Sequence, residues 1–347
     1  MMKNNVINDW QIKNGKEKDV VLSSRIRLAR NLKEYKFPNR SNFQEKNKLI
    51  NNLKDKLCFL TDQSYDFYLM NNLSVVERNV LHEEYLISNN HVQNPEAKAL
   101  FLNNKNNISI MINEEDHLRI QILKPGFEFN NIWDEINHLD DQLEEKLEYA
   151  FSKKWGYLTS CPTNVGTALR ASVMCHLPAL VLSGRIDNIL GAVGKLGLTV
   201  RGVSGEGSNS VAELFQISNQ ITLGFTEVEV MEKLESVIKQ IITEERKSRK
   251  YLLRNNFLNL KDNVLRSLGV LKYAYSLDES EALKYLSIIK FGQDTNLIEE
   301  KLDHNLFSKL LFRIKKAHLL YNSEKELESK DLNIKRAKII RNELNGE

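Results

Sequence analysis

Strand patterns in this chain of 347 residues are confined to about residues 18–250, and helical periodicity follows to the end. Residues 108–112 form an apolar strand segment, and residues 118–122 alternate apolar with polar positions. The acidic residues 113–116 join them, and so short a connection joins antiparallel strands. Alternation then places Arg119 on the face opposite the apolar row.

Two further strand segments lie at residues 198–201 and 213–221, again as neighbours along the chain. Helical periodicity fits residues 163–182, and Thr226 with Glu229 has the spacing of a capping box at the start of the next helix. Strands that neighbour one another, rather than alternate with crossover helices, predict an α+β fold.

Beyond this mixed segment the apolar residues follow helical spacing only. We therefore expect two domains, a mixed one over residues 18–251 and a helical one over residues 252–347. Two clusters of basic residues, around Arg249 and Arg336, have the composition of solvated helix faces.

Bulk composition argues against several classes of protein. A hydrophobic content of 41% suits a packed core, and a net charge of +3 is too small to indicate a nucleic-acid binder. The three cysteines, Cys58, Cys161 and Cys175, match no metal site, and their odd number argues against a disulfide framework. No apolar run is long enough to span a membrane, so we expect a soluble, cytoplasmic protein.

Five arginines stand in short polar segments suited to binding a polyphosphate: Arg25, Arg27, Arg119, Arg170 and Arg201. No glycine-rich loop with a lysine near its end accompanies them. Guanidinium groups stay charged and bind phosphate through two parallel hydrogen bonds, so they are able to replace such a loop. If the chain handles ATP, these arginines would bind its phosphates.

Carboxylates share the segments of two of these arginines. Glu114 and Glu115 precede Arg119 closely, and Glu206 lies five residues after Arg201. Carboxylates beside a phosphate clamp suit a cationic acceptor such as a guanidinium or an amine. The alternative for each glutamate is a solvated surface position.

Cys161 stands just before the predicted helix, where the helix N-terminus would favour its thiolate. The alternative is an inert, buried cysteine. Cys58 and Cys175 lie among apolar residues and are expected in the core. His117, at the end of the acidic turn, either orients a carboxylate or satisfies the turn.

Four segments together resemble the phosphagen (guanidino) kinase family and occur in its order: SSRIR at residues 23–27, NEEDHLR at 113–119, CPTN with the later RAS within 161–172, and RGVSGE at 201–206. Within the family the chain is most similar to bacterial protein arginine kinases, because only 22 residues precede Ser23 and a helical region follows the catalytic part. The resemblance implies an antiparallel sheet flanked by helices, then a helical C-terminal domain for phosphoarginine or substrate binding and dimerisation.

The resemblance also implies an activity: transfer of the γ-phosphoryl group of ATP to arginine side chains of proteins, with Mg²⁺ carried by the nucleotide. It assigns Glu114, Glu115, Glu206 and Cys161 to catalysis around the acceptor guanidinium. ATP would bind the five arginines and their neighbours, which are Ser23, Ser24, Ile26, Ala171, Ser172, Val173, Met174, Gly202, Val203, Ser204, Gly205 and Glu206.

By the same likeness, phosphoarginine would mark proteins for degradation by the Clp ATPase and its protease, and would regulate a heat-shock repressor in the stress response. The partners would be protein substrates with exposed arginines and a zinc-binding, McsA-like activator protein. We expect a homodimer through the helical domain, and neither nucleic acid nor membrane as a partner.

Two positions depart from the pattern of such kinases. Tyr85 stands where a histidine that contributes to the nucleotide site is usual. The allosteric phosphoarginine-binding motif Arg-Asp-x-x-Arg-Ala keeps only its second half, at Arg336 and Ala337 after Lys335. Two alternatives therefore stay open: a kinase for free arginine or another small guanidine, and a catalytically silent adaptor that binds phosphoarginine proteins or the protease.

Overall fold

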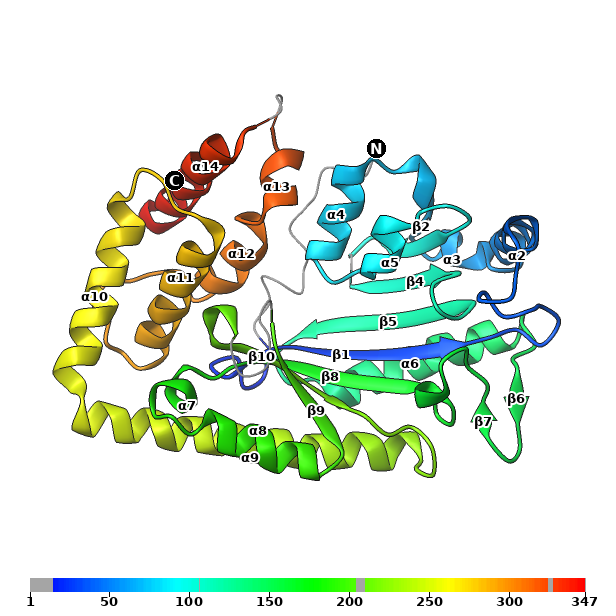
Figure 1. The fold of residues 1–347 in the computed structure, drawn as a ribbon, viewed down its shortest axis with the longest axis horizontal. Coiled ribbons are helices and arrows are strands. Elements are labelled where there is room, and N and C mark those ends of the chain that lie inside the picture. Colours follow the sequence, from blue (N-terminus) through cyan, green and yellow to red (C-terminus); the bar gives the residue numbers. More distant parts are fainter. Residues whose placement is uncertain (1–14, 106, 204–209, 324–326, 347) are drawn as a thin grey trace.

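A single eight-stranded sheet forms the centre of the molecule (Figure 1). The computed structural model describes residues 15–105, 107–203, 210–323 and 327–346. The strand order is β2-β3-β4-β5-β1-β8-β10-β9, and all neighbouring strands in it are antiparallel. The strands are β1 (Val21–Arg30), β2 (Tyr65–Leu69), β3 (Ala99–Asn103), β4 (Ile108–Ile112), β5 (Leu118–Pro125), β8 (Leu169–His176), β9 (Leu198–Gly202) and β10 (Leu214–Asn219).

The hairpin predicted at the acidic turn is confirmed as β4 and β5, with Ile110 opposite Ile120. Asn113 adopts a φ of 57° in the turn, and its amide donates to the carbonyl of Ala97 at 3.0 Å. Asparagine tolerates this left-handed conformation better than most residues. An antiparallel sheet with helices packed against it confirms the α+β class.

Alternation along the strands separates a core face from a polar face. In β1, Ile26 and Leu28 are buried in the main hydrophobic core, whereas Arg25 and Arg27 point to the opposite side. The core face packs against α6 (Phe129–Glu144), and the long helix α9 (Glu227–Asn255) contacts β8 and β10 (Figure 1). The polar face of the same strands is therefore free to form a site.

The helix predicted for residues 163–182 is wrong. The chain instead forms a short 3₁₀ turn, η2 (Pro162–Asn164), then β8, and then the short helix α7 (Pro178–Leu182). Leu169, Val173 and Leu177 are four residues apart, a spacing that satisfies the period of a helix and that of a strand alike. Because β8 lies in the middle of the sheet, nearly all of its residues are buried, and the polar alternation that marks a strand is hidden.

The predicted capping box is confirmed: the Thr226 hydroxyl accepts from Glu229 N, and the Glu229 carboxylate accepts from Thr226 N. Cys175 is buried as expected, but Cys58 is exposed at the start of its helix, so its predicted core position is wrong. The remaining elements of the mixed region are α2 (Phe43–Lys56), α3 (Cys58–Asp62), η1 (Met70–Asn72), α4 (Val75–Glu83), α5 (Asn89–Gln93), β6 (Phe151–Ser152), β7 (Gly156–Tyr157), α8 (Ile186–Lys195) and η3 (Val211–Glu213).

The C-terminal region is helical in the residues that the structure describes. Its helices pack around a second apolar core, which includes Leu271, Leu286 and Leu310 and extends to Leu123, Met174 and Leu214 of the sheet strands. Helix α9 runs through residue 252 and ends at Asn255, so the division into two domains at that point stays a prediction. The helices are α10 (Phe257–Tyr273), α11 (Glu279–Asp294), α12 (Leu306–Arg313), α13 (Lys316–Tyr321) and α14 (Ser329–Asn345).

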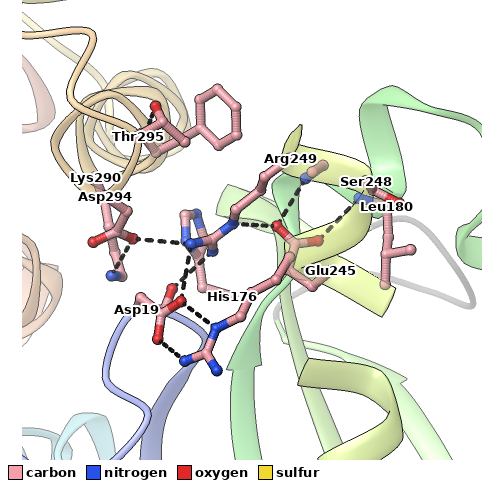
Figure 2. Close-up of polar contacts among 12 residues, drawn as sticks. Asp19, His176, Leu180, Glu245, Ser248, Arg249, Lys290, Asp294 and Thr295 are labelled. Atoms are coloured by element: carbon pink, nitrogen blue, oxygen red, sulfur yellow. Dashed lines mark hydrogen bonds and ion pairs between the residues drawn. The ribbon is translucent and has the colours of Figure 1, made fainter. Parts of the chain in front are cut away.

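A buried network of charges joins the sheet to this helical region (Figure 2). Arg249 of α9 donates through Nε to the Glu245 carboxylate at 2.8 Å and through Nη2 to the Asp19 carbonyl at 2.8 Å. Lys290 and Asp294 of α11 pair with each other at 2.8 Å on the far side of Arg249. Arg249 is only 5% exposed, so its predicted place on a solvated helix face is wrong.

Candidate active site

All five arginines identified in the sequence line one pocket of about 430 Å³ on the polar face of the sheet. Four strands supply them: β1 carries Arg25 and Arg27, β5 carries Arg119, β8 carries Arg170 and β9 carries Arg201. Arg27 lies opposite Arg170 in the register of β1 and β8. Segments that are far apart in sequence thus meet because their strands are neighbours in the sheet.

The guanidinium groups in this pocket repel one another. Burial and then the neighbouring Arg119 lower the pKa of Arg25 to about 10. Burial, followed by Arg25 and Arg119, holds the pKa of Arg27 well below its usual value, and its Nε is buried without a hydrogen-bond partner. Positive groups held this close stabilise an anion placed between them.

Carboxylates occupy one side of the same pocket. Glu114 forms an ion pair with Arg119 at 3.1 Å, and although burial acts to raise its pKa, Arg119 and hydrogen bonds lower it to about 2. Glu115 behaves in the opposite way: burial, Asp116 and Glu114 raise its pKa. Of two adjacent glutamates, one is therefore a fixed anion and the other is the better proton acceptor.

Asp116 fixes the backbone around these groups. Its Oδ1 accepts from the Asn31 amide and from the Ser160 backbone N–H, both at 2.6 Å. Ser160 precedes Cys161, so one carboxylate holds the acidic turn beside the cysteine loop.

Cys161 lines the pocket, and its Sγ lies 3.0 Å from the Thr163 hydroxyl. The segment that follows it is a three-residue 3₁₀ turn instead of the expected long helix, so the predicted helix-dipole effect on this thiol has no basis in the fold. Asn164 accepts from Arg170 Nε at 3.2 Å and holds that guanidinium in place.

Sequence reasoning missed several polar residues that line the pocket. Asn164 and Thr163 belong to the CPTN motif, so the motif itself could have identified them. Gln216, whose amide oxygen accepts from Arg25 at 3.3 Å, and Ser218 and Thr199 belong to β10 and β9. They face the pocket only because of the strand order, which the sequence alone does not show.

Other residues predicted for ATP binding lie beside the pocket without lining it. Ser24 is buried and donates to the Gly126 carbonyl at 2.7 Å. Seven more belong to β1, β8 and β9 and are not among the residues that line the cavity: Ser23, Ile26, Ala171, Ser172, Val173, Met174 and Gly202. Val203 packs against the second core. Ser204, Gly205 and Glu206 fall outside the described residues.

His117 satisfies the backbone and does not orient a carboxylate. Its Nδ1 accepts from Leu32 N at 3.0 Å, and its Nε2 lies 3.0 Å from the Lys36 carbonyl, to which it donates. Burial lowers the pKa of His117 to about 4, in keeping with this neutral tautomer.

Of the two departures from the family pattern, Tyr85 packs against the helical region and Arg336 belongs to it. Tyr85 has a φ of 62° and packs edge-on against Phe312 of α12, with ring centroids 5.8 Å apart. Arg336 is 3% exposed, and its guanidinium donates to the carbonyls of Ile314 and Leu277 at 2.8 and 2.9 Å. Its predicted solvated position is therefore wrong, and backbone carbonyls accept from its Nε and Nη1. Binding of phosphoarginine at this position stays a prediction.

A sheet that gathers arginines from four strands, with the carboxylates of one turn beside them, is the arrangement of a phosphotransferase that pairs a polyphosphate with a cationic acceptor. Residues 47–248 match the family described as ATP:guanido phosphotransferase, C-terminal catalytic domain, and residues 258–347 match the protein-arginine kinase McsB C-terminal domain. The chain belongs to the ATP:guanido phosphotransferase family.

Its relatives include proteins named protein-arginine kinase. One from Halothermothrix orenii is 48% identical over 99% of this chain and 98% of its own length, and one from Bacillus subtilis is 42% identical over 98% and 94%. The fold resembles a solved lombricine kinase, with a TM-score of 0.59, 27% identity and coverage of 66% of this chain and 67% of that one. A duplicated taurocyamine kinase from Schistosoma mansoni shares the fold with a TM-score of 0.61 and 24% identity, over 76% of this chain and 39% of the other.

Proposed function

We propose that this protein is a protein arginine kinase, which transfers the γ-phosphoryl group of ATP to arginine side chains of other proteins. The observation that supports it most is the pocket in which five arginines stand beside Glu114, Glu115 and Cys161. Similarity to protein-arginine kinases over nearly the whole length of the chain supports a protein as the acceptor.

The arginines bind the phosphate groups of ATP and leave the carboxylate side of the pocket for the acceptor. A guanidinium keeps its proton far above neutral pH and is a poor nucleophile until it loses that proton. Glu115, whose pKa is raised, accepts that proton while Cys161 lies beside the guanidinium. Glu206 is the second predicted carboxylate and lies outside the described residues. Alignment and electrostatic stabilisation then account for the rate, with no covalent intermediate on the enzyme.

Mg²⁺ enters this site with the nucleotide. No group of three or more His, Cys, Asp or Glu side chains suited to a metal ion occurs in the part of the chain that the structure describes. By likeness to the family, the ion would be held mainly by phosphate oxygens and water. When bound, the ion would supply positive charge to the polyphosphate, and the pocket arginines would bind its phosphate oxygens.

We also propose the partners, the regulation and the assembly of the kinase. Phosphoarginine marks substrates for the Clp ATPase and regulates a heat-shock repressor, a McsA-like protein activates the kinase, and the helical region forms a homodimer in the cytoplasm. These partners rest on likeness to the family. Within the described residues, no helix has the length and apolar character needed to cross a membrane.

Direct comparison of acceptors tests the proposed activity. The protein is incubated with ATP and Mg²⁺, together with either an arginine-rich protein or free arginine, with and without an activator. Acid-labile phosphate on the protein, mapped to arginine by mass spectrometry, is the expected result. Transfer to free arginine alone would identify a small-guanidine kinase, and a folded sample that binds no ATP and transfers nothing would identify an adaptor.

A further inference from the structure

The loop between β10 and α9 exposes apolar side chains at the edge of the sheet. Ile221, Leu223 and Phe225 are between 42% and 45% exposed, although apolar side chains in a connecting loop are usually few. Two neighbours have similar exposure. We call the five residues the apolar rim: Leu196, Ile221, Leu223, Phe225 and Val228.

Members of the apolar rim lie close to one another. A side chain built at Gly197 would come within 3.2 Å of Ile221 Cδ1 and 4.0 Å of Lys233 Nζ. The same Lys233 ammonium lies 5.6 Å from the centre of the Phe225 ring. Ile221 and Phe225 therefore lie on either side of Lys233, and Leu196 precedes the glycine beside Ile221.

Hydrogen bonds hold the loop that carries Ile221, Leu223 and Phe225 against residues 163–167. Thr222 is only 2% exposed, and its hydroxyl contacts the carbonyls of Thr163 and Val165 at 3.0 and 2.8 Å. Its own carbonyl accepts from the backbone N–H of Thr167 at 3.0 Å. A buried residue with a bonded hydroxyl and carbonyl thus stands between two exposed apolar residues, so the exposure of Ile221 and Leu223 does not result from a loosely held loop.

The same bonds fix the rim to the acceptor side of the active site. Residues 161–167 line the pocket with Cys161, Thr163 and Asn164, and their far end contacts the rim loop. Gly166 has a φ of 113°, and a Cβ there would lie 2.2 Å from Thr222 O and 2.9 Å from Leu223 Cα. The two loops approach so closely that only glycine fits between them.

We propose that the apolar rim is the docking surface for the segment of protein substrate that carries the acceptor arginine, and that it selects apolar residues beside that arginine. This inference rests on the proposed function. When the guanidinium lies beside Cys161 and Glu115, the chain that flanks it leaves the pocket across residues 161–167 and meets Leu223 and its neighbours. Rigid apolar anchors lose little conformational freedom on binding, so they favour an extended, unfolded segment. Free arginine has no flanking chain and gains nothing from the rim.

Steady-state kinetics with two acceptor peptides test this inference. One peptide places leucine and phenylalanine on either side of a single arginine, and the other places serines there. Leu223→Ser and Phe225→Ser should raise the KM of the apolar peptide at least fivefold, with kcat and the KM of ATP changed less than twofold. The serine-flanked peptide should have a higher KM than the apolar peptide on the wild type, and the variants should leave that value unchanged.

Leu258→Ser on α10 is the matched control, because Leu258 is 81% exposed and lies outside the rim and the pocket. It should leave both peptides unaffected. Equal KM values for the apolar peptide in wild type and both rim variants would overturn the docking surface while leaving the kinase activity in place. Variants that keep this KM but lower the molecular mass in solution would instead show a contact between copies. A wild-type protein that phosphorylates neither peptide nor any protein overturns the proposed function and the inference together.

Discussion

Glu114 and Arg119 form an ion pair at 3.1 Å inside the pocket, between the start of β5 and the turn that precedes it. The carboxylate is largely buried, and although burial opposes it, Arg119 brings the pKa of Glu114 to about 2. Arg119 is therefore held in one orientation before any nucleotide arrives, which lowers the conformational cost of binding phosphate.

Replacement of Arg119 should weaken nucleotide binding. A hydrogen bond to a charged group contributes about 1.5–3 kcal/mol, so Arg119→Ala should raise the Kd of ATP by roughly 10- to 150-fold. Arg119→Lys keeps the charge but loses the paired hydrogen bonds, so its Kd for ATP should lie between those of the wild type and Arg119→Ala. Isothermal titration calorimetry measures this, with Lys33→Ala as a control on the exposed surface. An unchanged Kd in Arg119→Ala would show that the ATP phosphates do not bind in this pocket.

Acid should inhibit transfer through Glu115. Burial, followed by Asp116 and Glu114, raises the pKa of this carboxyl above its ordinary value of 4.5. A proton acceptor is active when ionised, so the rate should fall as the pH drops through this raised pKa. Glu115→Gln should be at least a hundredfold slower and should lose this acidic limb. A variant that retains the wild-type pH profile would assign the proton to another group.

The three thiols should react in a fixed order. Cys58 is exposed, Cys161 is partly exposed in the pocket, and Cys175 is buried, with burial raising the pKa of its thiol. A thiol reagent should therefore modify two cysteines in the native protein and the third only after unfolding. In Cys58→Ser, the rate of phosphoryl transfer should fall as Cys161 is modified. Bound ATP and a protein acceptor should slow the modification of Cys161 and the loss of activity alike. Full activity after Cys161 is modified would separate this residue from the site.

Arg30 and Asp140 form a buried ion pair at 2.6 Å, and the Tyr149 hydroxyl donates to the same carboxylate at 3.0 Å. Asp140→Ala leaves the Arg30 charge buried without a partner, so the free energy of unfolding should fall by about 3–5 kcal/mol. Glu148→Ala breaks the exposed pair with Lys33 and should cost far less stability, because water screens that pair. Urea denaturation of both variants measures the difference, and equal losses would contradict the account of the buried pair.

A histidine ties the sheet region to the C-terminal helices. His318 of α13 contacts Glu83 through Nδ1 at 2.7 Å and Glu84 through Nε2 at 3.2 Å, where α4 and α13 lie side by side (Figure 1). Burial lowers its pKa, but the two carboxylates outweigh burial and raise the pKa above the ordinary 6.5. The charged contact therefore stabilises the fold fully below pH 6.5 and is lost as the pH rises through the higher pKa of the folded protein.

The free energy of unfolding should consequently fall between neutral and mildly alkaline pH, and His318→Gln should flatten that part of the profile. Burial and then Lys315, on the turn before α13, lower the pKa of the nearby His82, so that histidine does not account for a change above neutral pH. His138→Gln, an exposed residue on α6, is the control. An unchanged slope in His318→Gln would refute the contact as its cause.

Local patterns predicted the parts of this fold that local chemistry decides. The β4–β5 hairpin follows from its alternation and short turn, and the Thr226 cap from two side chains three residues apart. The central strand β8 was missed because neighbouring strands on both sides bury it, which leaves an apolar spacing that suits a helix as well. Arg249 and Arg336 were assigned to the solvent because the sequence does not show the carboxylates and carbonyls that enclose them.

The site shows the same limit. The resemblance to guanidino kinases selected the arginines and carboxylates by motif, and the sheet brings those of the described residues into one pocket. Gln216 and Ser218 carry no such motif, and they face the pocket only because β10 pairs with β8. A polar residue on a strand becomes part of a site through its neighbours across the sheet, which are distant in sequence.

The most direct test of the account is a single-turnover transfer experiment with ATP, Mg²⁺ and an arginine-rich protein, in which wild type is compared with Cys161→Ser and Glu115→Gln. The account predicts acid-labile phosphate on arginine in the wild type and a rate at least a hundredfold lower in Glu115→Gln, with ATP binding and folding unchanged. Cys161→Ser should also transfer far more slowly. Transfer at the wild-type rate in both variants would contradict the assignment of this pocket as the site of phosphoryl transfer.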